Sequence, residues 1–299
     1  MVLAVPKSIA SSWVKNENAI IYEVSDFVKV NNRVKIRIFF EFQCFFFTDI
    51  MSIFASALSY MDRKKYVIIM AAGHGTRMGA SFPKQFMDLG GKPILRLTIE
   101  KFLYADPDIS VVTVLPKEFM RTWKDYCQQN GFLCPQILVE GGITRFHSVK
   151  NALERVPDDL IVAIHDGVRP LVTPSLIEKM FREMENCRAL VPVLPSVDTL
   201  KAIRKVKHGD GSETLETIPD RQIDRSEIYR AQTPQMFLSE DIKAAYSQAY
   251  DTAFTDDASV AEKKGIPLSY IEGERNNIKI TTPEDLDYAR LMIKSADFV

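Results

Sequence analysis

From Tyr66 onward, short runs rich in Val and Ile alternate along the chain with segments of helical periodicity. Each run is expected to form a strand, and the runs are Val67–Met70, Ile109–Leu115, Gln136–Val139, Leu160–His165 and Leu190–Leu194. Before the fourth run, apolar residues repeat at i, i+3, i+4 and i+7, as on the buried side of a helix; they are Val149, Ala152, Leu153 and Val156. This alternation predicts an α/β fold, with a mainly parallel sheet covered by helices on both faces.

Two further helices are predicted from their first residues. Thr173-Pro174 places a capping hydroxyl before a proline, which is suited to the first turn of a helix. Thr282-Pro283 has the same arrangement, and acidic residues follow at the positive end of that helix.

The segment from about residue 195 to residue 230 interrupts the alternation. The stretches "TLKAIRKV" and "ETLETI" flank "KHGDGS", which is a strong turn signal between two extended runs. We expect a β-hairpin arm that projects from the main sheet. A polar hairpin is only marginally stable alone, so we favour an arm that clasps a second subunit over a solvent-exposed flap.

Residues 1–60 do not continue this pattern. They contain eight of the 18 Phe, and "IFFEFQCFFFTDIMSIFASALSY" has neither a helical nor a strand period. Charged residues interrupt the apolar stretch, so it does not resemble a membrane span, and no signal peptide is evident near Met1. We interpret residues 1–60 as a poorly ordered extension or a gene-start artefact, with Met61 as the better start and residues 61–299 as one domain. An interfacial membrane anchor is the alternative.

Composition narrows the classes of function. Apolar residues make up 46% and charged residues 26% of the chain, as is typical of a soluble globular protein. The net charge of -1 lacks the excess of basic residues that is typical of a nucleic-acid-binding protein. An anionic ligand would therefore need a local cluster of cations. The four Cys show neither C-x-x-C pairing nor metal-ligand spacing with the His residues, which indicates reduced cytosolic thiols.

The first candidate for chemistry is the glycine-rich loop in "VIIMAAGHGTRMGASFPKQF", residues 67–86. Its spacing matches neither a Walker loop nor a dinucleotide fingerprint, and it also carries Arg77 and Lys84. Glycines let the backbone approach a phosphate closely, and fixed cations offset the charge that builds up in phosphoryl or nucleotidyl transfer. A glycine turn with ordinary surface cations is the alternative.

The second candidate is "IVAIHDGVRP". Asp166 follows a predicted strand at its carboxyl end, where sheets of this class bind ligands. A carboxylate there can hold a Mg²⁺ that bridges phosphates, although a structural Asp that caps the turn would look the same. His165 points to the opposite side of the strand from Asp166, and we expect it to be a satisfied core histidine.

Three other segments offer weaker signals. In "EGGITRFHSVKNAL", Gly141-Gly142 ends a strand and Arg145 and Ser148 lie around the first turn of a helix, where backbone amides and a hydroxyl could contact a base or ribose. In "NNIKITTPEDL", Lys279 lies on a short β-rich run and could neutralise an α-phosphate, unless it is an ordinary edge-strand lysine. Polar residues at the ends of the arm could bind a phosphorylated polyol or simply be solvated; they are Asp198, Thr199, Lys201 and Arg225.

Taken in order, these motifs resemble one family. "AAGHGTRMGASFPKQF", "GGITRFHSV", "HDGVRP", "DTLK", "DRSEIYRAQTPQMF", "TDDASVAE" and "NNIKITTPEDL" are similar to the 2-C-methyl-D-erythritol 4-phosphate cytidylyltransferases. The resemblance runs from about Lys65 to the C-terminus, and nothing in residues 1–60 matches. It implies a Rossmann-like sheet of the glycosyltransferase-A-like nucleotidyltransferases.

The resemblance also implies an activity, which is the joining of CTP to the phosphate of methylerythritol phosphate with release of pyrophosphate. This is a cytoplasmic reaction of the non-mevalonate isoprenoid pathway. The family uses a divalent cation, usually Mg²⁺, and works as a homodimer whose arms reach the neighbouring subunit. Neither a nucleic acid nor a membrane partner is expected.

Carried over residue by residue, the resemblance assigns the site. The CTP-binding residues would be Ala71, Ala72, Gly73, Gly75, Gly141, Arg145, Ser148 and Asp166, with Asp166 also at the metal. The catalytic cations around the triphosphate would be Arg77, Lys84 and Lys279. The residues that bind the second substrate would be Thr199 and Arg225, across the dimer, and Thr255.

The sequence departs from the family pattern at two places. Asn276 stands where the family often has an acidic residue, and "HDGVRP" replaces the commoner "HDAARP" while keeping Asp166 and Arg169. A cytidylyltransferase acting on D-ribitol 5-phosphate shares most of the motifs and is the nearest alternative. A non-catalytic nucleotide-binding homologue is the second alternative, although it would be expected to have lost one of the cations or Asp166. A Rossmann dehydrogenase is disfavoured by the cations and spacing of the loop.

Overall fold

The computed structural model describes residues 27–30, 33–36, 63–73, 83–219, 221 and 223–295. The chain divides into two units, Met1–Ala55 and Ser56–Val299. In the first unit, the described residues form strands β1 (Phe27–Val30) and β2 (Arg33–Ile36), which pair antiparallel. Apart from these two strands, residues 1–60, which we interpreted as an extension or a gene-start artefact, lie outside the described residues.

The second unit is built on an eight-stranded sheet in the order β12-β9-β13-β8-β3-β6-β7, with β14 beside β9. Its strands are β3 (Lys65–Met70), β6 (Ser110–Leu115), β7 (Gln136–Glu140), β8 (Ile161–Asp166), β9 (Ala189–Pro195), β12 (Tyr229–Ala231), β13 (Gln235–Leu238) and β14 (Ser269–Glu272). The pairings of β3 with β6 and β8, of β6 with β7, and of β14 with β9 are parallel, whereas β12 and β13 run antiparallel to their neighbours. The prediction of a mainly parallel sheet is therefore confirmed, and the five predicted runs all form strands.

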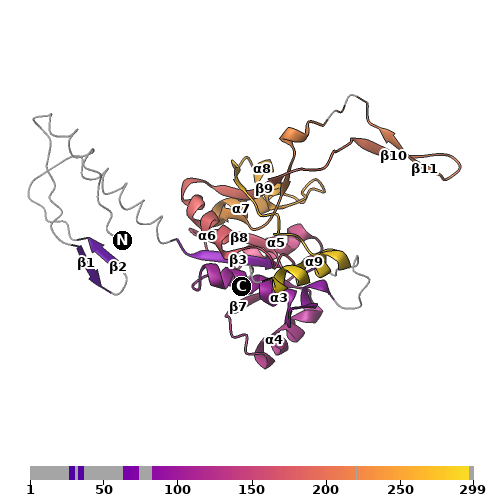
Figure 1. Cartoon of the computed structure of the whole chain (residues 1–299). Coiled ribbons are helices and arrows are strands. Elements are labelled where there is room, and N and C mark those ends of the chain that lie inside the picture. Colours follow the sequence, from indigo (N-terminus) through magenta and orange to yellow (C-terminus); the bar gives the residue numbers. More distant parts are fainter. Residues whose placement is uncertain are drawn as a thin grey trace, which may run out of the picture. The chain divides into compact units, whose positions relative to one another are not determined.

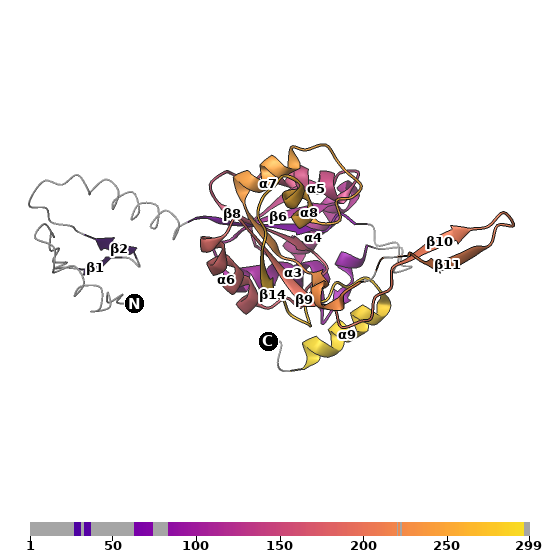
Figure 2. The same cartoon turned by 90° about the horizontal axis from the view of Figure 1, so that it is seen from above.

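Helices cover both faces of this sheet because side chains alternate along its strands. Val67 and Ile69 of β3 pack into one core cluster, while Ile68 between them packs into another. The helices of the first cluster are α3 (Ile94–Ala105), α4 (Met120–Gln129) and α6 (Pro174–Glu183), and those of the second are α5 (Arg145–Leu153), α7 (Ser239–Tyr246) and α8 (Asp257–Lys263). Figure 2 shows α5, α7 and α8 on one side of the sheet and α3 and α6 on the other.

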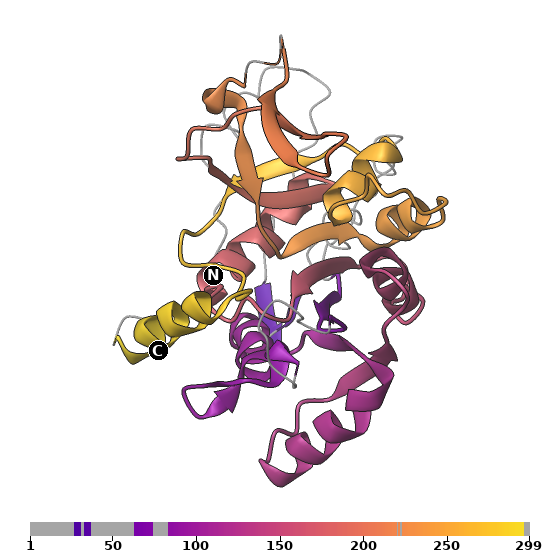
Figure 3. The same ribbon diagram turned by 90° about the vertical axis from the view of Figure 1, so that its right-hand side faces the viewer.

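A third core cluster lies under the last helix, α9 (Pro283–Lys294), which is the yellow helix next to the C marker in Figure 3. Leu286 and Ala289 of α9 pack there with Val168, just after β8, and with Ile280. This cluster holds the segment that precedes α9 against the end of β8.

The predicted helix starts are confirmed. The Thr173 hydroxyl accepts a hydrogen bond from the Leu176 backbone N–H at 3.1 Å, and Pro174 occupies the first turn. Thr282 and Asp285 form a reciprocal capping box at the start of α9.

Two expectations need correction. The periodicity placed Val156 on a helix, but α5 ends at Leu153, since Pro157 cannot continue a helix and also disfavours helical geometry at the residue before it. The β-rich run around Lys279 does not form a strand of the sheet. It is held instead by local contacts, such as the hydrogen bond from the Ile280 N–H to the Val168 carbonyl at 2.9 Å.

The hairpin arm is confirmed. β10 (Ile203–Lys207) pairs antiparallel with β11 (Glu213–Thr217) in a separate two-stranded sheet. Figure 1 shows the arm projecting from the domain that carries it. A turn closes it, in which the His208 N–H donates to the Ser212 carbonyl at 2.9 Å. The chain returns through the 3-10 turn η5 (Arg225–Glu227) to β12, which pairs with β9.

Candidate active site

Four neighbouring strands, β8, β3, β6 and β7, run parallel and end at the same edge of the sheet. Met70 at the end of β3 lies opposite Asp166 at the end of β8. On the other side, the Ala71 N–H donates to the Val114 carbonyl and the Gly141 N–H to the Leu115 carbonyl, both at 2.9 Å. The fold therefore brings the predicted residues after β3, β7 and β8 to one edge.

The glycine-rich loop leaves this edge after β3. Ala71, Ala72 and Gly73 are described, whereas two predicted residues, Gly75 and Arg77, lie outside the described residues. A side chain that was not predicted holds the base of the loop. The buried Gln85 amide donates to the Ala71 carbonyl at 2.7 Å and to the Gly73 carbonyl at 3.2 Å.

The turn between β7 and α5 lies directly against this loop base. A Cβ built on Gly141 would lie 2.5 Å from the Ala72 Cβ, so only glycine permits this approach. Ser148 is buried, and its hydroxyl accepts from the Gly142 N–H at 2.9 Å and donates to the Thr144 carbonyl at 2.9 Å. The Ser148 hydroxyl proton is thus used to shape the turn, and backbone groups form the surface next to Ala72.

Asp166 is the centre of charge at this edge. Its Oδ2 accepts from Arg169 Nε at 3.1 Å and lies 3.1 Å from Lys279 Nζ. Burial alone would raise the pKa of the Asp166 carboxyl, but the nearby charges of Lys279, Arg145 and Arg169 outweigh burial and hold the pKa well below its ordinary range. The carboxylate is therefore ionised at neutral pH.

The two described catalytic candidates converge on the same segment. Lys84 Nζ donates to the Ile280 carbonyl at 3.0 Å, next to Lys279, and the Lys279 side chain is 41% exposed. The structure thus brings Lys84 to the segment that carries Lys279, 195 positions later in the sequence, and places Lys279 beside Asp166 at the end of the sheet. This arrangement can bind a polyphosphate.

Arg145 begins α5, and its guanidinium is bound by a residue that sequence reasoning missed. Nη1 donates to Asp257 Oδ1 at 2.7 Å and Nη2 to Asp257 Oδ2 at 2.5 Å. Asp257 is fully buried, and the Tyr246 hydroxyl also donates to its Oδ1 at 2.5 Å. Burial and the adjacent Asp257 carboxylate raise the pKa of Tyr246 well above its ordinary value. The acidic pair in "TDDASVAE" was the available signal, but only Thr255 in it was assigned a role.

The expectation for His165 is confirmed, since its side chain is fully buried. Thr233 Oγ1 accepts from the Asp166 N–H at 3.1 Å, so its own proton can be donated to His165 Nδ1, 3.0 Å away. Nε2 then carries the ring proton and faces the Arg169 carbonyl at 3.3 Å. Burial lowers the pKa of His165 to about 3, so the ring is neutral.

The residues predicted to bind the second substrate are all exposed. Thr199 lies where the arm leaves the domain, and Arg225 Nη1 donates to the Val197 carbonyl at 3.3 Å on the returning side. Thr255 lies just before α8, and its N–H donates to Ser259 Oγ at 3.1 Å. Within the described part of the chain, no hydrogen bond or ion pair joins Thr255 to the arm.

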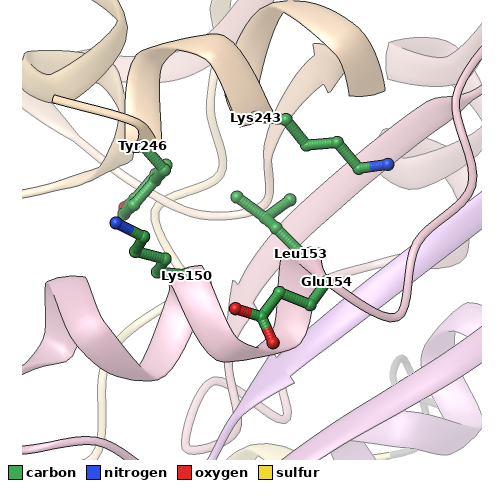
Figure 4. A pocket seen from close by; sticks show the side chains of 5 residues that line it. All are labelled: Lys150, Leu153, Glu154, Lys243 and Tyr246. Carbon is green, nitrogen blue, oxygen red and sulfur yellow. The ribbon is translucent and has the colours of Figure 1, made fainter.

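A hollow of about 260 Å³ lies elsewhere, between α5 and α7. Figure 4 shows the residues that line it, which are Lys150, Leu153, Glu154, Lys243 and Tyr246. The Lys243 amine points out of the hollow and pairs with Asp158 at 2.6 Å. α5 starts at the strand ends, and its last residue, Leu153, lines this hollow. The hollow is therefore at the opposite end of α5 from the candidate active site.

Over the described residues, no group of three or more His, Cys, Asp or Glu side chains could hold a metal ion. Among the same residues, no helix is long and apolar enough to cross a membrane.

Comparison with known proteins gives a consistent result. The sequence matches the model of the family described as IspD, 2-C-methyl-D-erythritol 4-phosphate cytidylyltransferase, over residues 66–295, a range that includes every predicted site residue. A relative of that name from Bacteroides thetaiotaomicron is 44% identical over 223 residues, which cover 75% of this chain and 96% of the relative. Another from Porphyromonas gingivalis strain W83 is 41% identical over 237 residues, covering 79% and 100%.

Solved structures agree in fold. The Francisella tularensis 2-C-methyl-D-erythritol 4-phosphate cytidylyltransferase is 30% identical with a TM-score of 0.60, covering 76% of this chain and 99% of that one. The 4-diphosphocytidyl-2C-methyl-D-erythritol synthase of Anaerococcus prevotii is 26% identical with a TM-score of 0.61, covering 77% and 98%.

Proposed function

Because the chain belongs to the 2-C-methyl-D-erythritol 4-phosphate cytidylyltransferase family, we propose that it transfers CMP from CTP to 2-C-methyl-D-erythritol 4-phosphate. The products are 4-diphosphocytidyl-2-C-methylerythritol and pyrophosphate, and the reaction is a step of non-mevalonate isoprenoid biosynthesis. The observation that carries the proposal lies within the matched range: Lys279 contacts Asp166 at the strand ends, and Lys84 contacts the backbone of the residue after Lys279.

The chemistry requires positioning and charge more than a base. An oxygen of the substrate phosphate, already ionised at neutral pH, attacks the α-phosphorus of CTP. A new P–O bond forms while the bond from the α-phosphorus to the bridging oxygen breaks, and pyrophosphate leaves with that electron pair. Negative charge grows on the oxygens around the α-phosphorus, and Lys84 and Lys279 are fixed where they can offset it. We assign the same role to Arg77.

CTP is proposed to bind along the edge formed by β3 and β7. The close approach of Gly141 to Ala72 leaves backbone groups on that surface, and a flat base can contact such groups. The glycine-rich loop, whose base is anchored by Gln85, follows β3 and would cover the phosphates. Ser148 contributes by holding the Gly142 turn, and Arg145 contributes a charge near Asp166.

Asp166 fits a magnesium ion that arrives with the nucleotide. Mg²⁺ is usually held by one or two carboxylates and by substrate phosphates rather than by an all-protein cage, and Asp166 supplies one carboxylate, ionised at neutral pH, at the strand ends. When bound, the ion would neutralise phosphate charge and orient the α-phosphate.

We also propose that the enzyme is a homodimer. The arm exposes apolar side chains that a second copy would cover, among them Ile203, 49% exposed, and Leu215, 64% exposed. Thr199 and Arg225 would then contact the second substrate of the neighbouring subunit, together with that subunit's own Thr255. Both substrates are water-soluble phosphates, which suits a cytoplasmic location.

The test is pyrophosphate release by the full chain with CTP and Mg²⁺, offering methylerythritol phosphate and D-ribitol 5-phosphate separately. Release with the former alone is expected. Lys84→Ala and Lys279→Ala should each lower kcat on the order of 10²- to 10³-fold. Lys124→Ala, at an exposed lysine of α4, is the control and should turn over normally.

Other outcomes would change the assignment. Release with ribitol phosphate alone would preserve the chemistry but replace the substrate. If folded protein releases no pyrophosphate with either substrate, the result would favour a non-catalytic homologue. Normal turnover by either lysine variant would contradict the proposed roles of these cations.

A further inference from the structure

Asn277 lies two residues before Lys279 and is fully buried. Its Nδ2 donates to the Thr233 carbonyl at 2.8 Å. Its own backbone carbonyl accepts from Arg169 Nη1 at 2.7 Å and from Gln232 Nε2 at 3.3 Å. Hydrogen bonds from two other parts of the fold, the segment after β8 and the Gln232-Thr233 pair, therefore meet at this residue.

Two of these partners lead directly to Asp166. Arg169 donates from Nε to Asp166 Oδ2 at 3.1 Å, while its Nη1 binds Asn277. Thr233 Oγ1 accepts from the Asp166 N–H at 3.1 Å, while its carbonyl binds the Asn277 amide. Asn277 is thus connected to Asp166 by one intermediate residue along two routes, to its carboxylate through Arg169 and to its backbone N–H through Thr233, and Lys279 Nζ faces that carboxylate at 3.1 Å.

The segment needs such an anchor because it is not a strand. No ladder of hydrogen bonds fixes the direction of residues 277–280, and the contact of the Ile280 N–H with the Val168 carbonyl lies beyond Lys279. Hydrogen bonds at Asn277, on one side of Lys279, and at Ile280, on the other, therefore determine where the backbone of Lys279 approaches Asp166.

The energetics at Asn277 also indicate a role beyond stability. Its Oδ1 is buried without a hydrogen-bond partner among the described residues. An unsatisfied buried acceptor destabilises the folded state, which offsets what the Nδ2 bond contributes. The Asn277 amide thus adds little net stability, but its hydrogen bond fixes the position of the backbone close to Lys279. Such a residue is suited to positioning the lysine.

We propose that Asn277 is a positioning residue for the transfer reaction, acting by holding Lys279 against Asp166. The inference rests on the proposed function of Lys279. It assigns Asn277 no contact with CTP or with the second substrate.

The test compares Asn277→Ala with Asn276→Ala in the full chain. Asn276 is a matched control because it is the same residue type one position earlier, and among the described residues its side chain bonds only to the exposed Tyr288 hydroxyl, at 2.9 Å. Because a displacement near 1 Å at a reacting group can cost about 10²-fold, Asn277→Ala should lower kcat on the order of 10- to 100-fold. KM for CTP should change much less, and Asn276→Ala should stay within about twofold of the parent.

A double-mutant cycle separates positioning from general stability. If Asn277 acts through Lys279, Asn277→Ala should cost nothing further in a Lys279→Ala background, as measured by product formed from CTP labelled at the α-phosphorus. An additive loss in the double variant, or a wild-type kcat in Asn277→Ala, would overturn the inference. If Asn277→Ala does not fold, Gln232→Met replaces it, since it removes the second donor to the Asn277 carbonyl and should couple to Lys279 in the same way.

Failure of the proposed function would look different. It would appear as absence of product with the parent chain, or as full turnover by Lys279→Ala, whatever happens at Asn277; either result would overturn this inference too. Failure of this inference alone leaves an active parent and an impaired Lys279→Ala.

Discussion

Arg145 and Asp257 form a two-point ion pair, with N–O distances of 2.7 and 2.5 Å, in which the carboxylate is fully buried. The pair joins the start of α5, at the strand ends, to the start of α8, which is 112 positions later in the sequence. The Tyr246 hydroxyl adds a third donor to the same carboxylate. Asp257 therefore fixes the direction of the Arg145 guanidinium, whose charge acts on Asp166.

Asp257→Asn should destabilise the fold and weaken nucleotide binding. The variant leaves Arg145 without its counter-charge, and hydrogen bonds to charged groups contribute about 1.5–3 kcal/mol, so the free energy of unfolding should fall by about that amount. KM for CTP should rise because Arg145 is no longer held. Urea denaturation and initial rates measure the two effects.

Tyr246→Phe is the matched control for Asp257→Asn. It removes one donor from Asp257 but keeps the ion pair, so the loss should be about 0.5–1.5 kcal/mol with little change in KM. An Asp257→Asn variant as stable as the parent would show that the buried pair makes no net contribution.

Gly141→Ala should disturb the nucleotide edge of the site. Its new Cβ would lie 2.5 Å from the Ala72 Cβ, so the turn after β7 must move away from the loop base. Overpacking of this kind costs about 1–3 kcal/mol, and KM for CTP should rise more than KM for methylerythritol phosphate. Gly209→Ala in the arm turn, where a Cβ meets nothing within 4 Å, should leave the melting temperature and both KM values unchanged. Equal effects of the two substitutions would argue against close packing at Gly141.

Sequence patterns predicted the sheet well because its strands are continuous apolar runs buried on both faces, as β8 shows. Asp166 and the glycine-rich loop were recognisable because each directly follows such a run. Short strands such as β12 and β14 were not predicted, since they depend on partners elsewhere in the sheet more than on their own composition.

The residues that hold the site together were less accessible from sequence. Gln85, Asp257 and Asn277 act through partners that are 11 or more positions away, and only folding reveals those partners. Their polar side chains give no local signal of burial. The family resemblance predicted which residues contact ligands. The hydrogen bonds that position those residues are visible only in the folded structure.

The buried His165 should make stability depend on pH. Its pKa is lowered to about 3 in the folded state from an ordinary value of about 6.5. Between these values the unfolded chain binds one more proton than the folded protein, so stability rises with pH in this range and is lost as pH falls from about 6.5 towards 3. The slope from this residue should approach about 1.4 kcal/mol per pH unit near pH 5.

His165→Gln tests this assignment. The neutral side chain keeps hydrogen-bonding groups but cannot titrate, so the variant should lose most of that slope between pH 6 and 4 in urea denaturation series. Asp166 also has a lowered pKa, but its contribution is lost only below about pH 4, which keeps the two effects apart. An unchanged slope in His165→Gln would assign the acid sensitivity to other groups.

The arm should determine the oligomeric state. Ile203 pairs with Thr217 and Leu215 with Lys205, so Ile203 and Leu215 lie on the same face of the hairpin. If a second copy covers that face, Leu215→Asp buries a charge in an apolar contact and should shift the protein from dimer to monomer in sedimentation. Thr214→Asp is the matched control, because Thr214 lies next to Leu215 on the opposite face and pairs with Val206.

Activity then distinguishes a structural dimer from one that completes the site. If Thr199 and Arg225 contact the second substrate bound to the neighbouring subunit, a monomer lacks those contacts. The Leu215→Asp monomer should then show a raised KM for methylerythritol phosphate and a smaller change in KM for CTP. The defect should lessen at high protein concentration, where the dimer re-forms by mass action. A monomer with unchanged kinetics would instead place the second substrate wholly within one chain, because the loss of a neighbour's residues must weaken binding if they contact the substrate.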